Sequence, residues 1–185
     1  MSDLIELSEY HGYLHFLARA QLSARYDGRL DSSDIVQQTL LQAHKCRAQF
    51  QGQTAAEQRA WLRSILVRHI AHATRELHTK MRDVKRERSL EAQLEASSMR
   101  LEKFLAAEQS SPSHQMVRQE NVHIIAGAIE KLPEPQRQVV ILRYWEEKTL
   151  QEIAELLNKS TPAVAGLLSR ANQKLRSILK DSSHH

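Results

Sequence analysis

Two apolar stripes with helical spacing, divided by a short break, lie between Leu150 and Leu179. They repeat at positions typical of one helix face, and they comprise Leu150, Ile153, Ala154 and Leu157, then Val164, Leu168, Ala171, Leu175 and Ile178. In the break, Ser160 is a favourable N-cap, and Pro162 falls in a first helical turn, where a missing N–H costs nothing. Two such helices joined by a turn of about three residues form a helix-turn-helix. The spacing predicts that motif.

The polar face of the second helix in this motif is basic. No acidic residue occurs between Glu155 and Asp181. A helix-turn-helix places its second helix in the major groove, so we expect phosphate contacts from Arg170, Lys174, Arg176 and Lys180. Ala165 and Gly166 stand where hydrogen-bonding side chains are expected, which predicts sparse direct base reading. A solvated basic face that binds no DNA is the alternative interpretation.

The rest of the chain is also predicted to be helical. Its 185 residues include only five glycines and four prolines, and no convincing period-two stretch occurs. We therefore expect an all-α fold with two helical domains, at residues 1–88 and 115–181. A linker at 89–114 joins them. Its spaced leucines allow a helix with a weak apolar stripe, and Ser110-Ser111-Pro112-Ser113 ends it.

Several classes of protein are disfavoured. No apolar run approaches the roughly 20 residues that span a bilayer, and the single cysteine excludes an internal disulfide, so we expect a cytoplasmic protein. Walker, Rossmann and nucleophile-elbow patterns are absent, which argues against an enzyme or a bound cofactor. The pairs His11/His15 and His69/His72 have helical metal-ligand spacing without a clear third ligand, so no metal site is predicted.

The N-terminal part offers two candidate binding faces. A helix starting near Asp34 has a buried stripe that includes Cys46, and Leu41 lies on its opposite, polar side. Leu41 is a small docking patch, unless another helix covers it. The next helix, from about Trp61 to Thr79, sets arginines and an aromatic ring opposite its core stripe. Such a face can hold phosphates and unstacked bases; a core role for Trp61 and a solvated arginine face are the alternatives.

Four segments, in this order, resemble conserved motifs of one family. They are Asp34-Ile35-Val36-Gln37-Gln38-Thr39, Trp61-Leu62-Arg63-Ser64-Ile65, Leu132-Pro133-Glu134-Pro135-Gln136-Arg137-Gln138-Val139 with Leu142-Arg143-Tyr144, and Glu152-Ile153-Ala154-Glu155-Leu156-Leu157 with Val164 and Arg170-Ala171. The chain resembles the extracytoplasmic-function sigma factors, the smallest members of the sigma-70 superfamily. The motifs span both predicted domains, with an acidic linker between them.

This resemblance implies a sigma factor that directs core RNA polymerase to promoter DNA and assists its melting. The surface expected on the β′ clamp helices of the polymerase comprises Asp34, Gln37, Gln38 and Leu41. The surface expected at the −10 element comprises Trp61, Ser64, Arg68, His72 and Arg75. The surface expected at the −35 element comprises Thr161, Pro162, Ala165, Gly166, Ser169, Arg170, Gln173 and Arg176. The C-terminal domain is expected to pack on the β flap, and an anti-sigma factor is a further partner that the resemblance allows.

The chain departs from the family pattern at several of these positions. Gln38 replaces the usual acid, and Arg68 and His72 stand where the family commonly has Asn and Asp. The promoter preference of relatives therefore cannot be transferred. A stand-alone repressor that binds palindromic DNA as a dimer is the main rival interpretation.

Overall fold

The computed structural model describes residues 6–26, 30–77, 84–108 and 122–182. The helices in these ranges are η1 (Leu7–Tyr10), α1 (His11–Tyr26), α2 (Ser32–Lys45), η2 (Arg47–Gln49), α3 (Ala55–Leu77), α4 (Val84–Glu108), α6 (Val122–Glu130), α7 (Glu134–Tyr144), α8 (Leu150–Leu156) and α9 (Thr161–Ser182). No strand occurs in the described ranges, which confirms the predicted all-α fold. None of their helices is both long enough and apolar enough to cross a membrane.

The N-terminal helices pack around α1. It lies against α2, α3 and α4, and its Tyr13, Leu14, Phe16 and Leu17 are almost fully buried. Asp31 caps α2, because its carboxylate accepts a hydrogen bond from Ser33 N–H at 2.7 Å. The buried side of α2 comprises Ile35, Val36, Thr39 and Ala43. Cys46, which the sequence placed on this stripe, lies just past the helix and is only partly buried.

Helix α3 starts earlier than the sequence pattern suggested. Its first residue is Ala55, and the reason is a reciprocal cap. The Thr54 hydroxyl accepts from Glu57 N–H at 3.2 Å, while the Glu57 carboxylate accepts from Thr54 N–H at 3.0 Å. This capping box satisfies backbone donors of the first turn, so the helix can begin before its apolar stripe.

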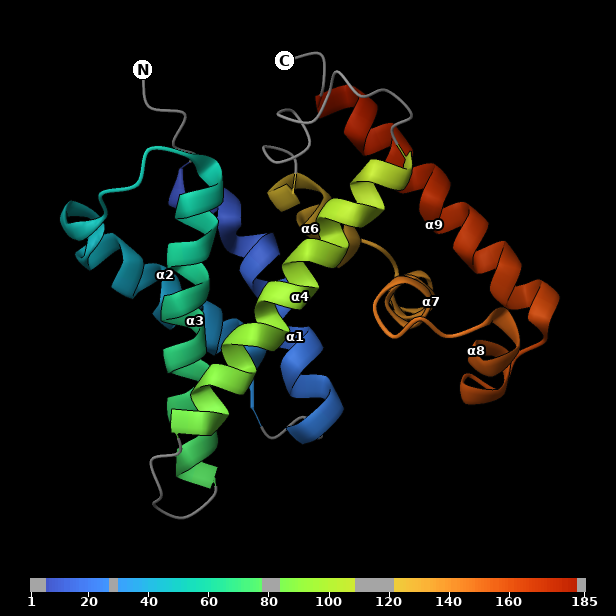
Figure 1. Cartoon of the computed structure of the whole chain (residues 1–185). Helices are drawn as coiled ribbons and strands as arrows, with labels where there is room; N and C mark the ends of the chain where they lie inside the picture. The colour runs from blue at the N-terminus through green and yellow to red at the C-terminus, as the bar shows by residue number, and fades with distance from the viewer. Residues whose placement is uncertain (1–5, 27–29, 78–83, 109–121, 183–185) are drawn as a thin grey trace.

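Helix α4 packs against helices of both the N-terminal and the C-terminal part of the chain. It crosses the middle of the structure in Figure 1 and packs against α3, α1 and α6. Its buried positions are Leu90, Leu94, Ser97, Ser98, Leu101 and Phe104. Residues 89–108 of the expected linker are thus a packed helix with a substantial apolar stripe, not a weak one, and residues 109–114 lie outside the described ranges.

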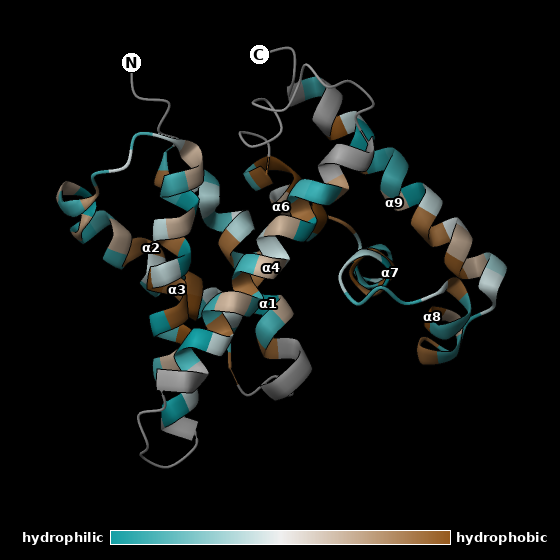
Figure 2. Ribbon diagram, in the orientation of Figure 1, coloured by the Kyte–Doolittle hydropathy of each residue, from teal (hydrophilic) through white to brown (hydrophobic). Residues whose placement is uncertain are grey.

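One hydrophobic core extends through both parts of the chain. It includes Phe16 of α1, Leu94 of α4, Ile125 of α6 and Leu175 of α9. Figure 2 shows α6 coloured almost throughout as apolar, in keeping with a helix enclosed by α1, α4 and α9. At its end, Pro133 is the N-cap of α7, and Pro135 lies in the first turn of that helix.

Candidate nucleic-acid interface

The predicted helix-turn-helix is confirmed as α8, a short turn and α9. Thr149 and Glu152 form a capping box at the start of α8, and Ala163 N–H donates to the Ser160 hydroxyl at 3.3 Å at the start of α9. Between them Asn158 adopts a left-handed conformation with φ of 50°, which asparagine tolerates better than most residues. This turn fixes the angle between the two helices without a glycine.

A small apolar core holds α8 against α9. Its buried residues are Val139, Ile153, Ala154 and Val164, with Leu142, Leu150, Leu157, Leu167 and Leu168 packed around them. Further along α9, Ala171 and Leu175 are fully buried. The second apolar stripe predicted from the sequence is therefore the inner face of α9, and its other face is turned to solvent.

The solvent face of α9 carries the residues expected at the −35 element. Gly166 is half-buried, and the exposed residues are Thr161, Pro162, Ala165, Ser169, Arg170, Gln173 and Arg176. Lys174 is exposed beside them, and the side chain of Lys180 lies outside the described part of the chain. An exposed, acid-free helix face after a helix-turn-helix turn can enter a DNA groove.

Gly166 lies beside the side chain of Arg170, four residues further along α9. A Cβ at position 166 would lie 3.4 Å from Arg170 Nη1 and 3.8 Å from Nη2. The guanidinium group therefore lies back along the helix, over the glycine. The sequence marked Gly166 as a gap in base reading, and the structure places the Arg170 guanidinium group over this position at distances that a Cβ would also tolerate.

The α3 residues expected at the −10 element differ in their exposure. Arg68 and His72 are exposed. Arg75 is held within the fold, because Nε donates to the Ala71 carbonyl at 3.1 Å and Nη2 pairs with Glu87 Oε1 of α4 at 3.1 Å. Ser64 donates to the Trp61 carbonyl at 2.7 Å. Arg68 and His72 are accordingly the two exposed positions of this set, and Trp61, Ser64 and Arg75 are partly buried.

Trp61 has an aromatic partner that the sequence did not reveal. It is partly buried, and its ring centroid lies 4.9 Å from that of Phe50. The Phe50 ring covers Gly52, where a Cβ would approach Phe50 Cζ to 2.3 Å. Trp61 is therefore neither a fully buried core anchor nor a free platform. A glycine two residues after Phe50 was the only local signal for this arrangement.

Charge near this face is set by burial and by helix capping. Burial, with the His72 charge adding to it, lowers the pKa of His69. Hydrogen bonds from the backbone of Gln53, then from the side chain and backbone of Thr54, lower the pKa of Glu57 below its ordinary 4.5. At neutral pH the first turn of α3 thus carries the negative charge of Glu57, and His69 is neutral. In the described residues no group of three or more His, Cys, Asp or Glu side chains is arranged to hold a metal ion.

The exposed side of α2 carries the residues expected on the polymerase. Asp34, Gln37 and Gln38 are exposed, and 56% of the surface of Leu41 is accessible to solvent. No other described helix covers Leu41, so the structure favours the open patch over the alternative of a covered side chain. An exposed leucine among polar groups is suited to an apolar contact with a partner.

Comparison with known proteins gives matches to sigma factors. Residues 123–175 match the family model Sigma-70, region 4. The chain is 39% identical over 72 residues to RNA polymerase sigma factor FliA of Pseudomonas aeruginosa, covering 39% of this chain and 29% of that protein. It is 36% identical over 69 residues to RNA polymerase sigma-D factor of Bacillus subtilis, covering 37% of this chain and 27% of that protein. The matched part of the chain thus spans less than a third of the length of either relative.

The matched residues coincide with the helices that build the helix-turn-helix. The family model runs from His123 in α6 to Leu175 in α9, and it takes in the whole of the small apolar cluster that holds α8 against α9. The chain therefore carries a sigma-70 region 4 domain at residues 123–175.

Proposed function

We propose that this chain is an RNA polymerase sigma factor that brings core polymerase to promoters and assists DNA melting. One observation carries the proposal: the region 4 match falls on a helix-turn-helix whose second helix has an exposed face without an acidic residue from Thr161 to Lys180. The names of the relatives, both RNA polymerase sigma factors, support the same function. A sigma factor of this kind is not itself an enzyme, and it acts in the cytoplasm.

In this proposal three helix faces each bind a different partner. The α9 face binds the −35 element, with Arg170 and Arg176 on phosphates. The α3 face binds the −10 element, where exposed Arg68 and His72 meet the unpaired strand beside Trp61. The α2 face around Leu41 docks on the β′ clamp helices. The chain's C-terminal helices pack on the β flap.

The extracytoplasmic-function subtype is the finer part of the proposal. It rests on the motifs at Asp34–Thr39 and Trp61–Ile65, which lie outside the region 4 match. The exposed polar face of α2 and the solvent face of α3 support the roles that those motifs imply. Division into two domains that act at separate promoter elements belongs to the same subtype, and so does regulation by an anti-sigma factor.

The modest net charge of +4 fits a protein that reads DNA only on polymerase. Flipping a base out of the duplex costs a few kcal/mol, and stacking returns about 1–3 kcal/mol per base, so opening is closely balanced. Tethering two weak contacts to one polymerase raises the effective concentration of the second. We therefore expect the free chain to bind duplex promoter DNA poorly.

In vitro transcription with purified core polymerase on a promoter library tests the proposal. The chain should generate transcripts from a defined subset of promoters that core polymerase alone does not use. Arg170→Ala should lower transcription from this subset, while Lys103→Ala, at an exposed position on α4, should leave it unchanged. If core polymerase neither binds the chain nor gains specificity from it, the proposal is wrong.

A gel-shift experiment distinguishes the stand-alone repressor from the proposed sigma factor. A repressor binds a palindromic duplex tightly as a dimer without polymerase. A specific shift by the chain alone at physiological salt would favour the repressor.

A further inference from the structure

A groove of about 540 Å³ is lined by residues of α1, of α4 and of the end of α7 with the residues that follow it. Ile141 and Trp145 belong to its apolar wall. The polar and charged side chains that line it are Arg19, Gln21, Gln93, Ser97, Arg100 and Glu146. A groove of this size, with an apolar wall and a few polar groups, is the usual form of a small-molecule site. None of these residues belongs to the faces of α2, α3 or α9 proposed for polymerase and DNA.

Neighbouring helices hold Trp145 in place at the wall of the groove. Its ring is buried and lies edge-on to Phe16 of α1, with ring centroids 4.8 Å apart. Trp145 Nε1 donates to the Ser97 carbonyl at 3.3 Å, and the Trp145 carbonyl accepts from Arg100 Nη1 at 2.5 Å. Ser97 and Arg100 both belong to α4. The wall is therefore formed before a ligand arrives, which reduces the entropy lost on binding.

Arg100 brings a positive charge to this groove. Its side chain is partly buried, and it donates to a neutral carbonyl, that of Trp145. In the described ranges no carboxylate forms an ion pair with it. A guanidinium group has five N–H donors in a planar fork, so Arg100 retains donors for another group. Such a fork can donate two parallel hydrogen bonds to one carboxylate or phosphate group.

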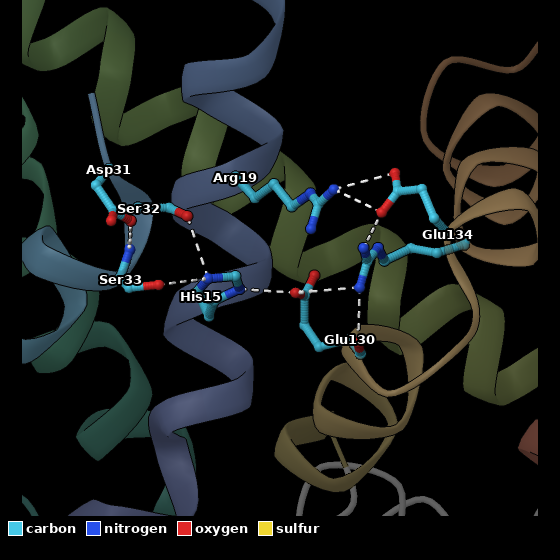
Figure 3. A network of polar contacts seen from close by, with 8 residues as sticks. His15, Arg19, Asp31, Ser32, Ser33, Glu130 and Glu134 are labelled. Carbon is cyan, nitrogen blue, oxygen red and sulfur yellow. Dashed lines mark hydrogen bonds and ion pairs between the residues drawn. The ribbon is translucent and has the colours of Figure 1, made fainter. Parts of the chain in front are cut away.

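The other arginine of the groove, Arg19, already has an acidic partner. Its Nη2 donates to Glu134 Oε1 at 3.0 Å and to Oε2 at 2.9 Å. Burial opposes ionisation of Glu134, but the hydrogen bonds and charges of Arg137 and Arg19 outweigh it and lower its pKa. Figure 3 shows this pair next to another, in which His15 Nδ1 lies 2.7 Å from Glu130 Oε2. Of the two arginines, Arg100 is therefore the one that can pair with an incoming anion.

Two amide side chains of the groove are suited to neutral parts of a ligand. Gln21 is only 9% exposed, and no hydrogen-bond partner for its side chain is found in the described ranges. A buried amide without a partner costs free energy, which a ligand can recover. Gln93 is partly buried, and its Nε2 donates to the Ser89 hydroxyl at 3.0 Å. Its Oε1 can still accept a hydrogen bond.

We infer that this groove is a binding site for a small organic oxyanion, a carboxylate or a phosphate ester. The charged group of the ligand pairs with Arg100, and its neutral polar groups bind the amides of Gln21 and Gln93. Glu146 lines the same groove and is exposed. Its carboxylate repels a second negative charge and accepts hydrogen bonds from N–H or O–H groups. The site therefore favours a ligand that carries such donors beside its oxyanion over a bare inorganic anion.

Isothermal titration calorimetry of the full chain tests the site. The probes are malate, glycerol 3-phosphate and inorganic phosphate, each measured against sodium chloride at equal ionic strength. Malate or glycerol 3-phosphate should bind with a millimolar or lower dissociation constant, one molecule per chain, and more tightly than inorganic phosphate. The better of the two identifies the oxyanion as a carboxylate or a phosphate ester. If neither organic probe binds at millimolar concentration, the inference is wrong.

Two matched substitutions test the role of Arg100. Arg100→Gln removes the charge but keeps a donor for the Trp145 carbonyl, and it should weaken binding of the organic probe roughly 10-fold or more. Arg143→Gln is the control, because Arg143 also donates to a carbonyl, that of Lys148 at 2.9 Å, but does not line the groove. Arg143→Gln should bind as wild type does. Equal affinity of Arg100→Gln and wild type would overturn the inference.

The two tryptophans of the chain show where the ligand binds. In a ¹H–¹⁵N spectrum, the organic probe should shift the indole signal of Trp145 and leave that of Trp61 unchanged, with Trp61→Phe assigning the two signals. Gln93→Ala should weaken binding without altering helix content by circular dichroism. If Arg100→Gln fails to fold, the Trp145 signal and Gln93→Ala decide. A shift of Trp61 alone, or full affinity in Gln93→Ala, would place the ligand elsewhere and contradict the inference.

Discussion

The Leu41 side chain contributes little to the stability of the fold, because 56% of its surface remains accessible to solvent. Its neighbours on the same face of α2, Asp34 and Gln38, are polar and exposed. An apolar side chain at the centre of a polar ring is where a protein–protein contact concentrates its binding energy. A charge at this position leaves the fold intact and opposes docking.

We expect Leu41→Glu to weaken core polymerase binding by roughly 10-fold or more, since it places a charge in an apolar contact. Fluorescence anisotropy with labelled chain and purified core polymerase measures the change. Met99→Glu, at a residue of α4 that is 53% exposed, is the matched control and should bind as wild type. Unchanged affinity of Leu41→Glu would refute the α2 docking face.

Arg75 already has a partner within the fold, because its guanidinium group pairs with the Glu87 carboxylate at 3.1 Å. A role in DNA opening requires that this pair be exchanged for a phosphate. We expect Arg68→Ala with Arg75→Ala to slow promoter opening more than it weakens closed-complex formation, as followed by stopped-flow fluorescence. Glu87→Ala frees the same arginine and should not slow opening. If it slows opening as much as the arginine pair does, the contact is structural.

At the scale of elements, the N-terminal caps of α3 and α8 are built alike. In each a threonine and a glutamate three residues later satisfy each other's backbone donors. Hydrogen bonds from the Thr149 backbone, then from its side chain, lower the pKa of Glu152 below 4.5. A carboxylate with a lowered pKa contributes stability at pH values above 4.5, and that stability is lost as the pH falls through the folded value.

Glu152→Gln should therefore be less stable than wild type at pH 7. The difference should shrink as the pH falls below 4.5, because wild type then loses the same charge. Urea unfolding followed by circular dichroism at pH 7 and at acid pH measures it. A stability difference that stays constant across this range would mean that the carboxylate does not cap α8.

Sequence periodicity correctly predicted the helices whose apolar stripe and capping residues indicate the same bounds. The helix-turn-helix is such a case: Leu150 to Ile178 repeat with helical spacing, and Ser160 marks the turn. The start of α3 was placed too late, because the Thr54–Glu57 cap lies before the apolar stripe. Residues 89–108 were assigned to a linker although their spaced leucines allowed a helix, because spacing alone does not show that Leu90, Leu94 and Leu101 are buried against other helices.

The sequence could predict which face of a single helix carries candidate site residues, but not which residues of different helices lie together. The exposed faces of α2 and α9 follow from spacing. The Phe50–Trp61 ring contact and the Arg75–Glu87 pair join residues on different elements, and spacing within one helix carries no information about them. The same holds for the contacts of α1 with α6 and α7, where Glu130 is 115 positions from His15 and Glu134 is 115 positions from Arg19.

At the scale of the whole molecule, one core runs from α1 to α9, although the proposed function needs two separate DNA-binding faces. The exposed residues of α3 and α9 are thus carried by one packed body. In the proposed function each face alone binds DNA weakly, and the polymerase supplies the tether that joins the two contacts.

The most direct test of this account is footprinting on a promoter selected by in vitro transcription, with hydroxyl radicals for protection and permanganate for unpaired thymines. Chain and core polymerase together should protect two regions about 25 base pairs apart and make thymines near −10 reactive, and neither component alone should do so. Arg170→Ala should weaken upstream protection, and Arg68→Ala should reduce permanganate reactivity. A single protected palindrome produced by the chain without polymerase would contradict the account.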